Sequence, residues 1–146
     1  MKLQVSAKAD YALRALVVLA AQPPGCSITS TDIARDQGIP KKFLENILVE
    51  LRRKGLTRSA RGPSGGFRLG APPEQITIAH VLQALDGPLP DPRAPQPQAS
   101  DDSPTVATLE RIWLAAQSSV RDLFEGITLA DIVRGELPVP ATAKAD

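Results

Sequence analysis

The residues best suited to chemistry in this sequence are cations that gather between positions 40 and 70. These 31 residues hold eight lysines and arginines against two glutamates, a net charge of +6, while residues 1–39 carry +1 and residues 71–146 carry −6. The overall charge of +1 is therefore the sum of a strongly basic central segment and a strongly acidic C-terminal half. Basic side chains concentrated in so short a segment are typical of a surface that binds a polyanion such as nucleic acid. A solvated basic helix face is the alternative interpretation.

The same segment predicts a helix-turn-helix. Residues 40–54 favour an amphipathic helix, because apolar residues recur there at helical spacing and should face a core: Phe43, Leu44, Ile47, Leu48 and Leu51. Pro40 suits the first position of that helix, and Gly55 suits the turn that closes it. A shorter helix over residues 32–37 precedes it across a turn at Gly38. In such a motif the second helix enters the major groove of DNA.

A small wing is expected directly after this helix. Residues 56–59 and 67–69 favour two short strands, and the glycine-rich basic segment between them predicts the tip of a hairpin. A helix that fits a groove, followed by a cationic hairpin, is the layout of a winged helix-turn-helix. The expected fold class is therefore mainly α with a small β-wing. The first expectation about function is sequence-specific binding of double-stranded DNA.

Four polar residues near the start of the 40–54 helix are candidates for contacts with base edges. We expect Lys41 and Lys42 on the face opposite the apolar stripe, where they could bind phosphate or the O6/N7 edge of guanine. Asn46 could pair with the N6/N7 edge of adenine. Glu45 could accept a hydrogen bond from cytosine N4, or it could form a bracing salt bridge instead. The alternative for both lysines is a solvated helix face.

The wing offers a second set of candidates. Arg61 precedes the glycine-rich tip, and an arginine carried there suits the narrow, electronegative minor groove. Gly65 and Gly66 would let the backbone approach the duplex without side-chain bulk. Arg58 and Arg68 flank the tip, either as phosphate contacts or as a cationic edge on an exposed strand.

The N-terminal segment predicts one further phosphate contact. Residues 7–22 favour a helix with Ser6 as its N-cap. Ser6 and Lys8 could clamp a phosphate at this helix N-terminus. The next, short helix should be capped by Ser30 or Thr31.

The chain divides into four parts. Residues 1–87 form the expected DNA-binding domain, which ends with a helix capped by Thr77. Residues 88–104 contain six prolines and almost nothing apolar, so they predict a linker. Residues 105–137 are expected to hold a long helix and a short terminal one, and residues 138–146 a loose tail.

The long helix has an apolar stripe that needs a partner surface. Over residues 105–124, apolar residues alternate in steps of three and four. The stripe consists of Val106, Leu109, Trp113, Ala116, Val120 and Leu123. It could pack in the core of its own chain or against the same helix of a second copy, which would make the stripe a dimer interface.

Several kinds of function are disfavoured. Cys26 is the only cysteine, which excludes a disulfide within the chain, the cysteine-rich zinc sites and an all-cysteine iron–sulfur site. We find no paired nucleophile and base and no phosphate-cradling loop before a helix, so an enzyme is not expected. No apolar run reaches the roughly 18 residues that a membrane span requires, and we expect a cytoplasmic protein.

Several segments together resemble the Rrf2 family of bacterial transcription regulators, which includes iron–sulfur-cluster and nitric-oxide-sensing repressors. The likeness is strong over about residues 1–88 and moderate over 105–135, and the wing string at 61–69 together with the Thr-Leu-Ala-Asp at 128–131 makes it specific. The matching segments are residues 6–16, 33–34, 38–39, 43–45, 51–56, 61–69, 81–87 and 127–131.

The resemblance implies a homodimer, joined by the long C-terminal helix, that binds an inverted-repeat operator, most often as a repressor. Cluster-binding members carry three cysteines between the winged domain and the dimer helix, where residues 88–104 here have no cysteine and no histidine. This chain therefore resembles the cluster-free branch, with no cofactor or metal expected. Asp10 matches the position of an acid that some nitric-oxide sensors donate to the cluster, but here it and the lone His80 have no cysteine partners.

Three alternatives stay open at this stage. One is an effector, either a small molecule or a protein, that the sequence does not identify. Another is a regulator that holds a metal or cluster through ligands other than cysteine. The last is a winged-helix module for protein–protein contact, which the +6 segment disfavours.

Overall fold

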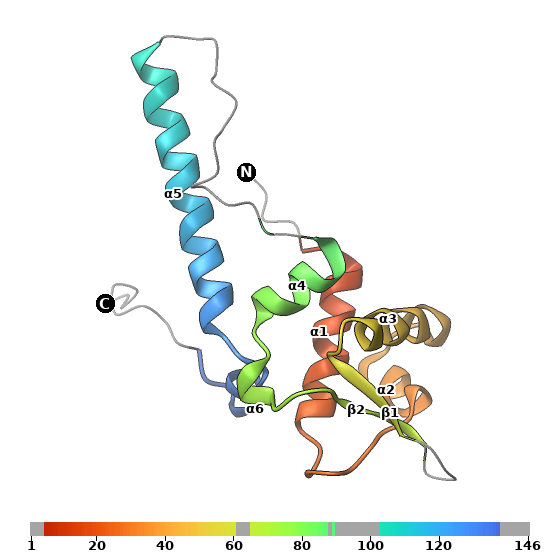
Figure 1. Ribbon diagram of the computed structural model, residues 1–146. Helices are drawn as coiled ribbons and strands as arrows, with labels where there is room; N and C mark the ends of the chain where they lie inside the picture. The colour runs from red at the N-terminus through yellow and green to blue at the C-terminus, as the bar shows by residue number, and fades with distance from the viewer. Residues whose placement is uncertain (1–4, 61–64, 88, 90–102, 138–146) are drawn as a thin grey trace.

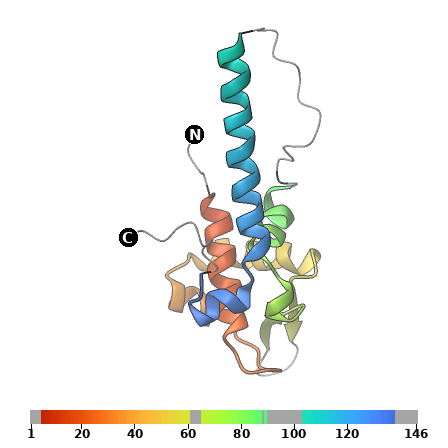
Figure 2. The same cartoon turned by 90° about the vertical axis from the view of Figure 1, so that its left-hand side faces the viewer.

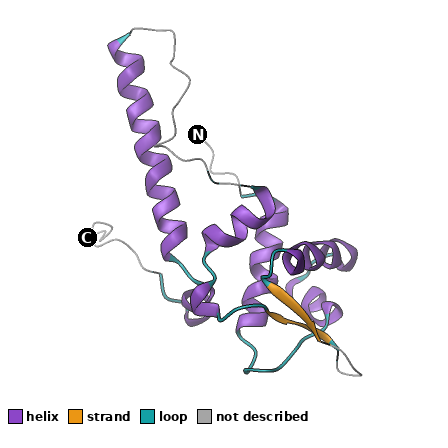
Figure 3. Ribbon diagram, viewed as in Figure 1, coloured by secondary structure: helices purple, strands orange, loops and turns teal. Residues whose placement is uncertain are grey.

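The computed structural model describes residues 5–60, 65–87, 89 and 103–137. Helices dominate this part of the chain, and one two-stranded antiparallel sheet joins them (Figure 3). The fold class expected from the sequence is therefore confirmed. In chain order the elements are α1 (Ala7–Ala20), α2 (Ser30–Gln37), α3 (Lys41–Arg53), β1 (Thr57–Ala60), β2 (Gly66–Leu69), the 3-10 turn η1 (Pro73–Gln75), α4 (Ile78–Asp86), α5 (Pro104–Gly126) and α6 (Leu129–Arg134).

Helix α1 is the centre of the winged domain. It packs against α2, α3 and β2 on one side and against α4 and α6 on the other (Figure 1). The core is built from aliphatic side chains that each of these elements turns inward, and Leu16, Ile33, Leu44, Ile47, Leu48, Leu51, Ile76, Val81 and Leu129 are its large, fully buried members.

Of the caps expected at Ser6, at Ser30 or Thr31, and at Gly55, two are observed and one differs. The Ser6 hydroxyl accepts a hydrogen bond from the Ala9 amide at 3.1 Å, as predicted. Helix α2 is capped by Thr29 instead of Ser30 or Thr31 and so begins earlier, because the Thr29 hydroxyl accepts a hydrogen bond from the Asp32 amide at 3.1 Å. Gly55 follows the end of α3 as expected.

Two boundaries around prolines also differ from the prediction. Helix α1 ends at Ala20, short of residue 22, because a residue before proline disfavours the helical backbone and Gln22 precedes Pro23. Pro40 is the N-cap of α3 instead of its first residue. Gly38, with φ of 64°, supplies the left-handed turn between α2 and α3.

The prediction that Phe43 is buried is wrong. The four buried apolar residues of α3 follow an i, i+3, i+4, i+7 pattern, and each is at most 1% exposed: Leu44, Ile47, Leu48 and Leu51. Phe43 lies at the edge of that stripe and stays 40% exposed. Its ring lies nearly perpendicular to that of Tyr11 on α1, with the two ring centroids 5.7 Å apart.

The wing is a short hairpin anchored at its base. Strands β1 and β2 pair from Thr57 opposite Leu69 to Ala60 opposite Gly66. Thr57 is buried, and its hydroxyl donates to the Leu48 carbonyl at 3.3 Å. Phe67 also exchanges two backbone hydrogen bonds with Ile28, at 2.8 and 3.0 Å, which makes Ile28 a third, one-residue strand.

Gly66 is required by this packing. A Cβ atom added there would lie 2.5 Å from the Ile28 carbonyl oxygen, so the backbone would have to move. The sequence had suggested instead that Gly66 is small in order to approach DNA. The structure supplies a reason for glycine within the protein itself.

We therefore expect Gly66→Ala to destabilise the protein by about 1–3 kcal/mol, the usual cost of overpacking. Gly126→Ala is the matched control, since no atom lies within 4 Å of the added Cβ and alanine favours a helix. Urea unfolding of both variants measures the difference. Equal stability of the two variants would contradict the close approach at Ile28.

The winged domain and the long helix are joined by a backbone bridge. Thr77 and Thr128 pair as an isolated antiparallel bridge, and the Ile78 amide donates to the Ile127 carbonyl at 3.0 Å. Each threonine also caps the helix that follows it, and its own amide donates in return to the side chain of His80 or Asp131. The hydrogen bond from the Thr128 backbone lowers the pKa of the Asp131 carboxyl, helped by Arg134. The end of α5 is thus fixed to the start of α4.

Helix α5 projects from the domain. Its 23 residues extend about 35 Å at the rise of an α-helix. Its contacts with the rest of the domain lie mainly along α4, and it rises well beyond the other helices (Figures 1 and 2). None of its described side chains is fully buried. Among the described residues, no helix is both long and apolar enough to cross a membrane.

Candidate nucleic-acid interface

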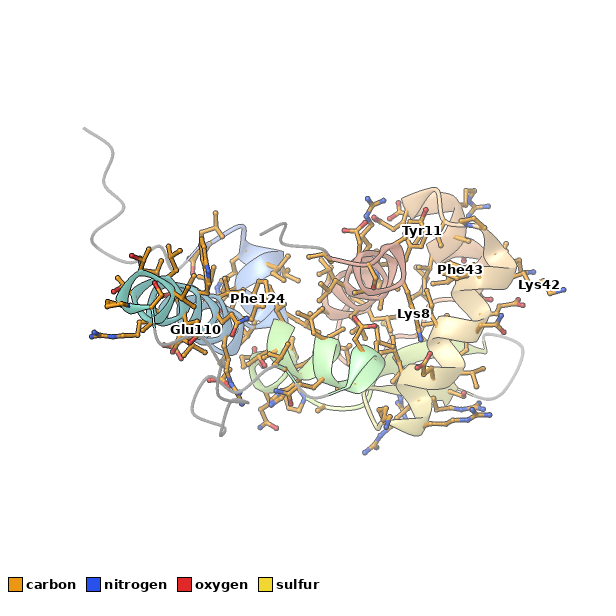
Figure 4. All side chains as sticks on the ribbon, turned by 90° about the horizontal axis from the view of Figure 1, so that it is seen from above. Lys8, Tyr11, Lys42, Phe43, Glu110 and Phe124 are labelled. Atoms are coloured by element: carbon orange, nitrogen blue, oxygen red, sulfur yellow. The ribbon has the colours of Figure 1, made fainter. Side chains whose placement is uncertain are left out.

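Helix α3 turns its most polar face away from the protein. Lys42, Asn46, Val49 and Arg53 follow one another at steps of four, three and four residues, so they share one face opposite the buried stripe. We call these four residues the outer face of α3. The Lys42 side chain extends from it into open space (Figure 4). This is the helix surface that a DNA groove can reach.

Two contacts hold one flank of α3 against α1. The Lys8 ammonium pairs with the Glu50 carboxylate at 2.7 Å, and the Tyr11 and Phe43 rings meet edge to face (Figure 4). On the other flank, an Arg52 Nη atom donates to the Ser59 hydroxyl of β1 at 3.0 Å. Helix α3 is therefore braced on both sides. Sequence reasoning gave no role to Tyr11 or Arg52 and placed Phe43 in the core, because contacts of α3 with α1 and β1 have no signal in local spacing.

The structure separates the predicted base-contacting residues into two groups. Lys42 and Asn46 are exposed on the outer face of α3. Lys41 and Glu45 lie on the flank and form an ion pair at 3.9 Å, which matches the bracing alternative for Glu45. Both remain exposed, so an exposed pair of this kind contributes little to stability and can be exchanged for other partners.

The wing places two arginines directly opposite each other. Arg58 on β1 pairs with Arg68 on β2, and both side chains are exposed. Neither forms an ion pair with any residue in the described part of the chain. Like charges at facing positions of a hairpin are destabilising. Such a pair suits a surface that meets an external polyanion.

The remaining residues predicted to contact DNA either lie outside the described residues, are partly buried, or already have a partner within the protein. Arg61 lies outside the described residues, and Gly65 is partly buried next to β2. The Ser6 hydroxyl is used as an N-cap, and the Lys8 ammonium is used by Glu50. A phosphate at the start of α1 would therefore have to share Lys8 with Glu50.

Comparison with known proteins identifies the family. The family model for Rrf2, described as an iron-dependent transcriptional regulator, matches residues 5–135. The chain belongs to the Rrf2 family. A Mycobacterium tuberculosis protein named as a candidate HTH-type transcriptional regulator is 41% identical over 144 residues, covering 99% of this chain and 89% of that protein. The HTH-type transcriptional regulator IscR of Vibrio campbellii is 30% identical, covering 90% of this chain and 78% of its own.

Solved structures agree with this assignment. CymR, the global cysteine regulator of B. subtilis, superposes with a TM-score of 0.78 at 28% identity, over 92% of this chain and 98% of CymR. IscR of T. potens follows with a TM-score of 0.73 at 25% identity, over 100% of this chain and 95% of its own. The Rrf2 protein described here is thus a transcriptional regulator and not an enzyme.

The donors in this Rrf2 chain do not fit an iron–sulfur cluster. Its one cysteine, Cys26, is exposed, which places the chain with the cluster-free branch. Asp10 pairs with Arg14 at 2.8 Å, and His80 Nδ1 accepts from the Thr77 amide at 3.3 Å, so each has a partner within the protein. Among the described residues, no group of three histidine, cysteine or acidic side chains could hold a metal ion.

We therefore expect protein purified without oxygen to contain no stoichiometric iron and to lack charge-transfer bands. Cys26→Ser should bind DNA within about twofold of the unmodified chain, as for other surface substitutions. Iron analysis, visible spectra and DNA titration measure this. Stoichiometric iron that is lost in Cys26→Ser would contradict the cluster-free assignment.

Proposed function

We propose that this Rrf2 protein binds an inverted-repeat operator as a homodimer and represses transcription. We also propose that it is located in the cytoplasm. The observation that carries the proposal is the arrangement of two separate surfaces. The outer face of α3 and the wing arginines present cations that form no ion pair within the described residues, while α5 presents an apolar stripe that the described part of the chain leaves partly exposed.

The α5 stripe supports the dimer. Among its members Leu109, Trp113 and Leu123 are 42%, 49% and 40% exposed, and Ile112 beside them is 50% exposed. Large apolar side chains exposed in a row along one helix mark an interaction surface. A second α5 related by two-fold symmetry offers a matching stripe, which makes self-association the simplest way to cover it.

The basic surface supports DNA binding. We place the N-terminal part of α3 in the major groove, with Lys42 and Asn46 toward base edges and Lys41 toward phosphate. Glu45 can then leave Lys41 to accept a hydrogen bond from cytosine N4.

The wing supplies further contacts in this arrangement. Arg58 and Arg68 contact the sugar–phosphate backbone beside the groove, and Arg61 is proposed to enter the minor groove.

One experiment tests both parts. The whole chain is used to select duplexes from a random-sequence library, and the selected duplex is then titrated and sedimented with the protein. We expect an inverted repeat with half-sites roughly 34 Å or a multiple apart, bound by two chains. A selected site without symmetry, bound by one chain, would contradict the homodimer, and the absence of any enriched sequence would contradict specific DNA binding. Transcription in vitro from a promoter containing the site should fall as protein is added.

A further inference from the structure

We propose that Phe43 contacts the C5-methyl group of a thymine in each half-site and so helps to set the operator sequence. This inference deepens the proposed function and rests on it. Phe43 is the third residue of α3, in the first turn of the helix that we place in the major groove. It is the only phenylalanine among the exposed large apolar residues of the described chain.

The chemistry of the side chain limits what it can recognise. A phenyl ring has no hydrogen-bonding atom, so it cannot bind phosphate or distinguish donors from acceptors on a base edge. The thymine methyl is the apolar group that a base pair presents in the major groove. Phe43 therefore has one suitable partner in that groove, and it lies beside Lys42, whose side chain extends outward (Figure 4).

The ring is held in place before any DNA arrives. The Phe43 and Tyr11 rings lie nearly perpendicular, with their centroids 5.7 Å apart. The Arg14 guanidinium in turn lies 5.7 Å from the Tyr11 ring centroid, and Asp10 pairs with that guanidinium at 2.8 Å. This row of contacts orders Phe43 while leaving 40% of it exposed. A contact made by an ordered side chain loses little entropy on binding.

Removal of the methyl group alone tests the contact. The probe is the duplex selected from the random library, with thymines replaced by deoxyuridine one symmetric pair at a time. With the unmodified chain, one replaced pair should weaken binding about fourfold per half-site, as expected for one buried methyl group, and therefore roughly 16-fold for the pair. Phe43→Ala should bind the thymine duplex more weakly and show equal affinity for the two duplexes.

Two further variants keep the test decisive. Phe43→Gln retains the length of the side chain without the ring and should also bind the thymine and deoxyuridine duplexes equally. This second variant keeps the test valid if Phe43→Ala does not fold. Val133→Ala removes an exposed apolar side chain from α6, outside the proposed DNA-binding surface, and should keep the discrimination between thymine and deoxyuridine. If the unmodified chain binds every deoxyuridine duplex as tightly as the thymine duplex, or if Phe43→Gln keeps the discrimination, the inference is wrong. A chain that selects no DNA at all would instead contradict the proposed function.

Discussion

Replacing Leu109 and Leu123 with aspartate is expected to separate the chain into monomers and to weaken operator binding at least about 100-fold. The two residues lie 14 positions apart on one face of α5, about 21 Å along the helix, and both are exposed in the isolated chain. The substitutions therefore leave the winged domain intact. In the proposed dimer they would bury two carboxylates per chain against an apolar surface, which costs several kcal/mol.

A matched control separates this effect from a general one on the helix. Ala107 and Ala115 are exposed on α5 outside the stripe, so Ala107→Asp with Ala115→Asp adds the same charge at similar helix propensity. Sedimentation at micromolar concentration and titration of the selected duplex measure both variants. The prediction fails if the Leu109 and Leu123 variant stays dimeric, or if the alanine variant dissociates to the same extent.

The elements that carry the function were predictable because they depend on local pattern. The apolar spacing of α3 and the glycines of the wing determine helix, turn and hairpin within about 30 residues. The same holds for α5, where the expected helix over residues 105–124 and the observed Pro104–Gly126 nearly coincide. Boundaries differed where several residues were equally suitable as caps, as at Thr29, Ser30 and Thr31, and beside prolines, as at the end of α1 and the start of α3.

The contacts between α1 and α3 were not predictable in the same way. Phe43 was assigned to the core because phenylalanine is apolar, but its position at the edge of the stripe exposes it beside Tyr11. Lys8 was predicted to contact phosphate, and the sequence did not indicate that it also pairs with Glu50, which lies far along the chain on α3. These outcomes depend on how two helices cross, which spacing along one helix does not determine.

Replacing Arg58 and Arg68 with glutamine is expected to weaken binding to the selected duplex at least about tenfold at physiological salt, while leaving the protein as stable or more stable. Each lost phosphate contact should reduce the log–log salt slope by about 0.9, so the slope should fall by about 1.8. The gain in stability follows because the two arginines face each other directly across the hairpin. Relief of that repulsion contributes roughly 0.2–1 kcal/mol.

The expected loss of DNA affinity and the expected gain in stability have opposite signs. Together they distinguish a DNA-binding role of Arg58 and Arg68 from a structural one. A residue that only supports the wing would lower the unfolding temperature when it is replaced, and DNA affinity would fall with it. Arg111→Gln with Arg134→Gln removes the same charge from α5 and α6, far from the wing, and should leave the salt slope unchanged. An unchanged slope in the Arg58 and Arg68 variant would contradict phosphate contacts by the wing. If the melting temperature of this variant fell along with its DNA affinity, the role of Arg58 and Arg68 would instead be to stabilise the hairpin.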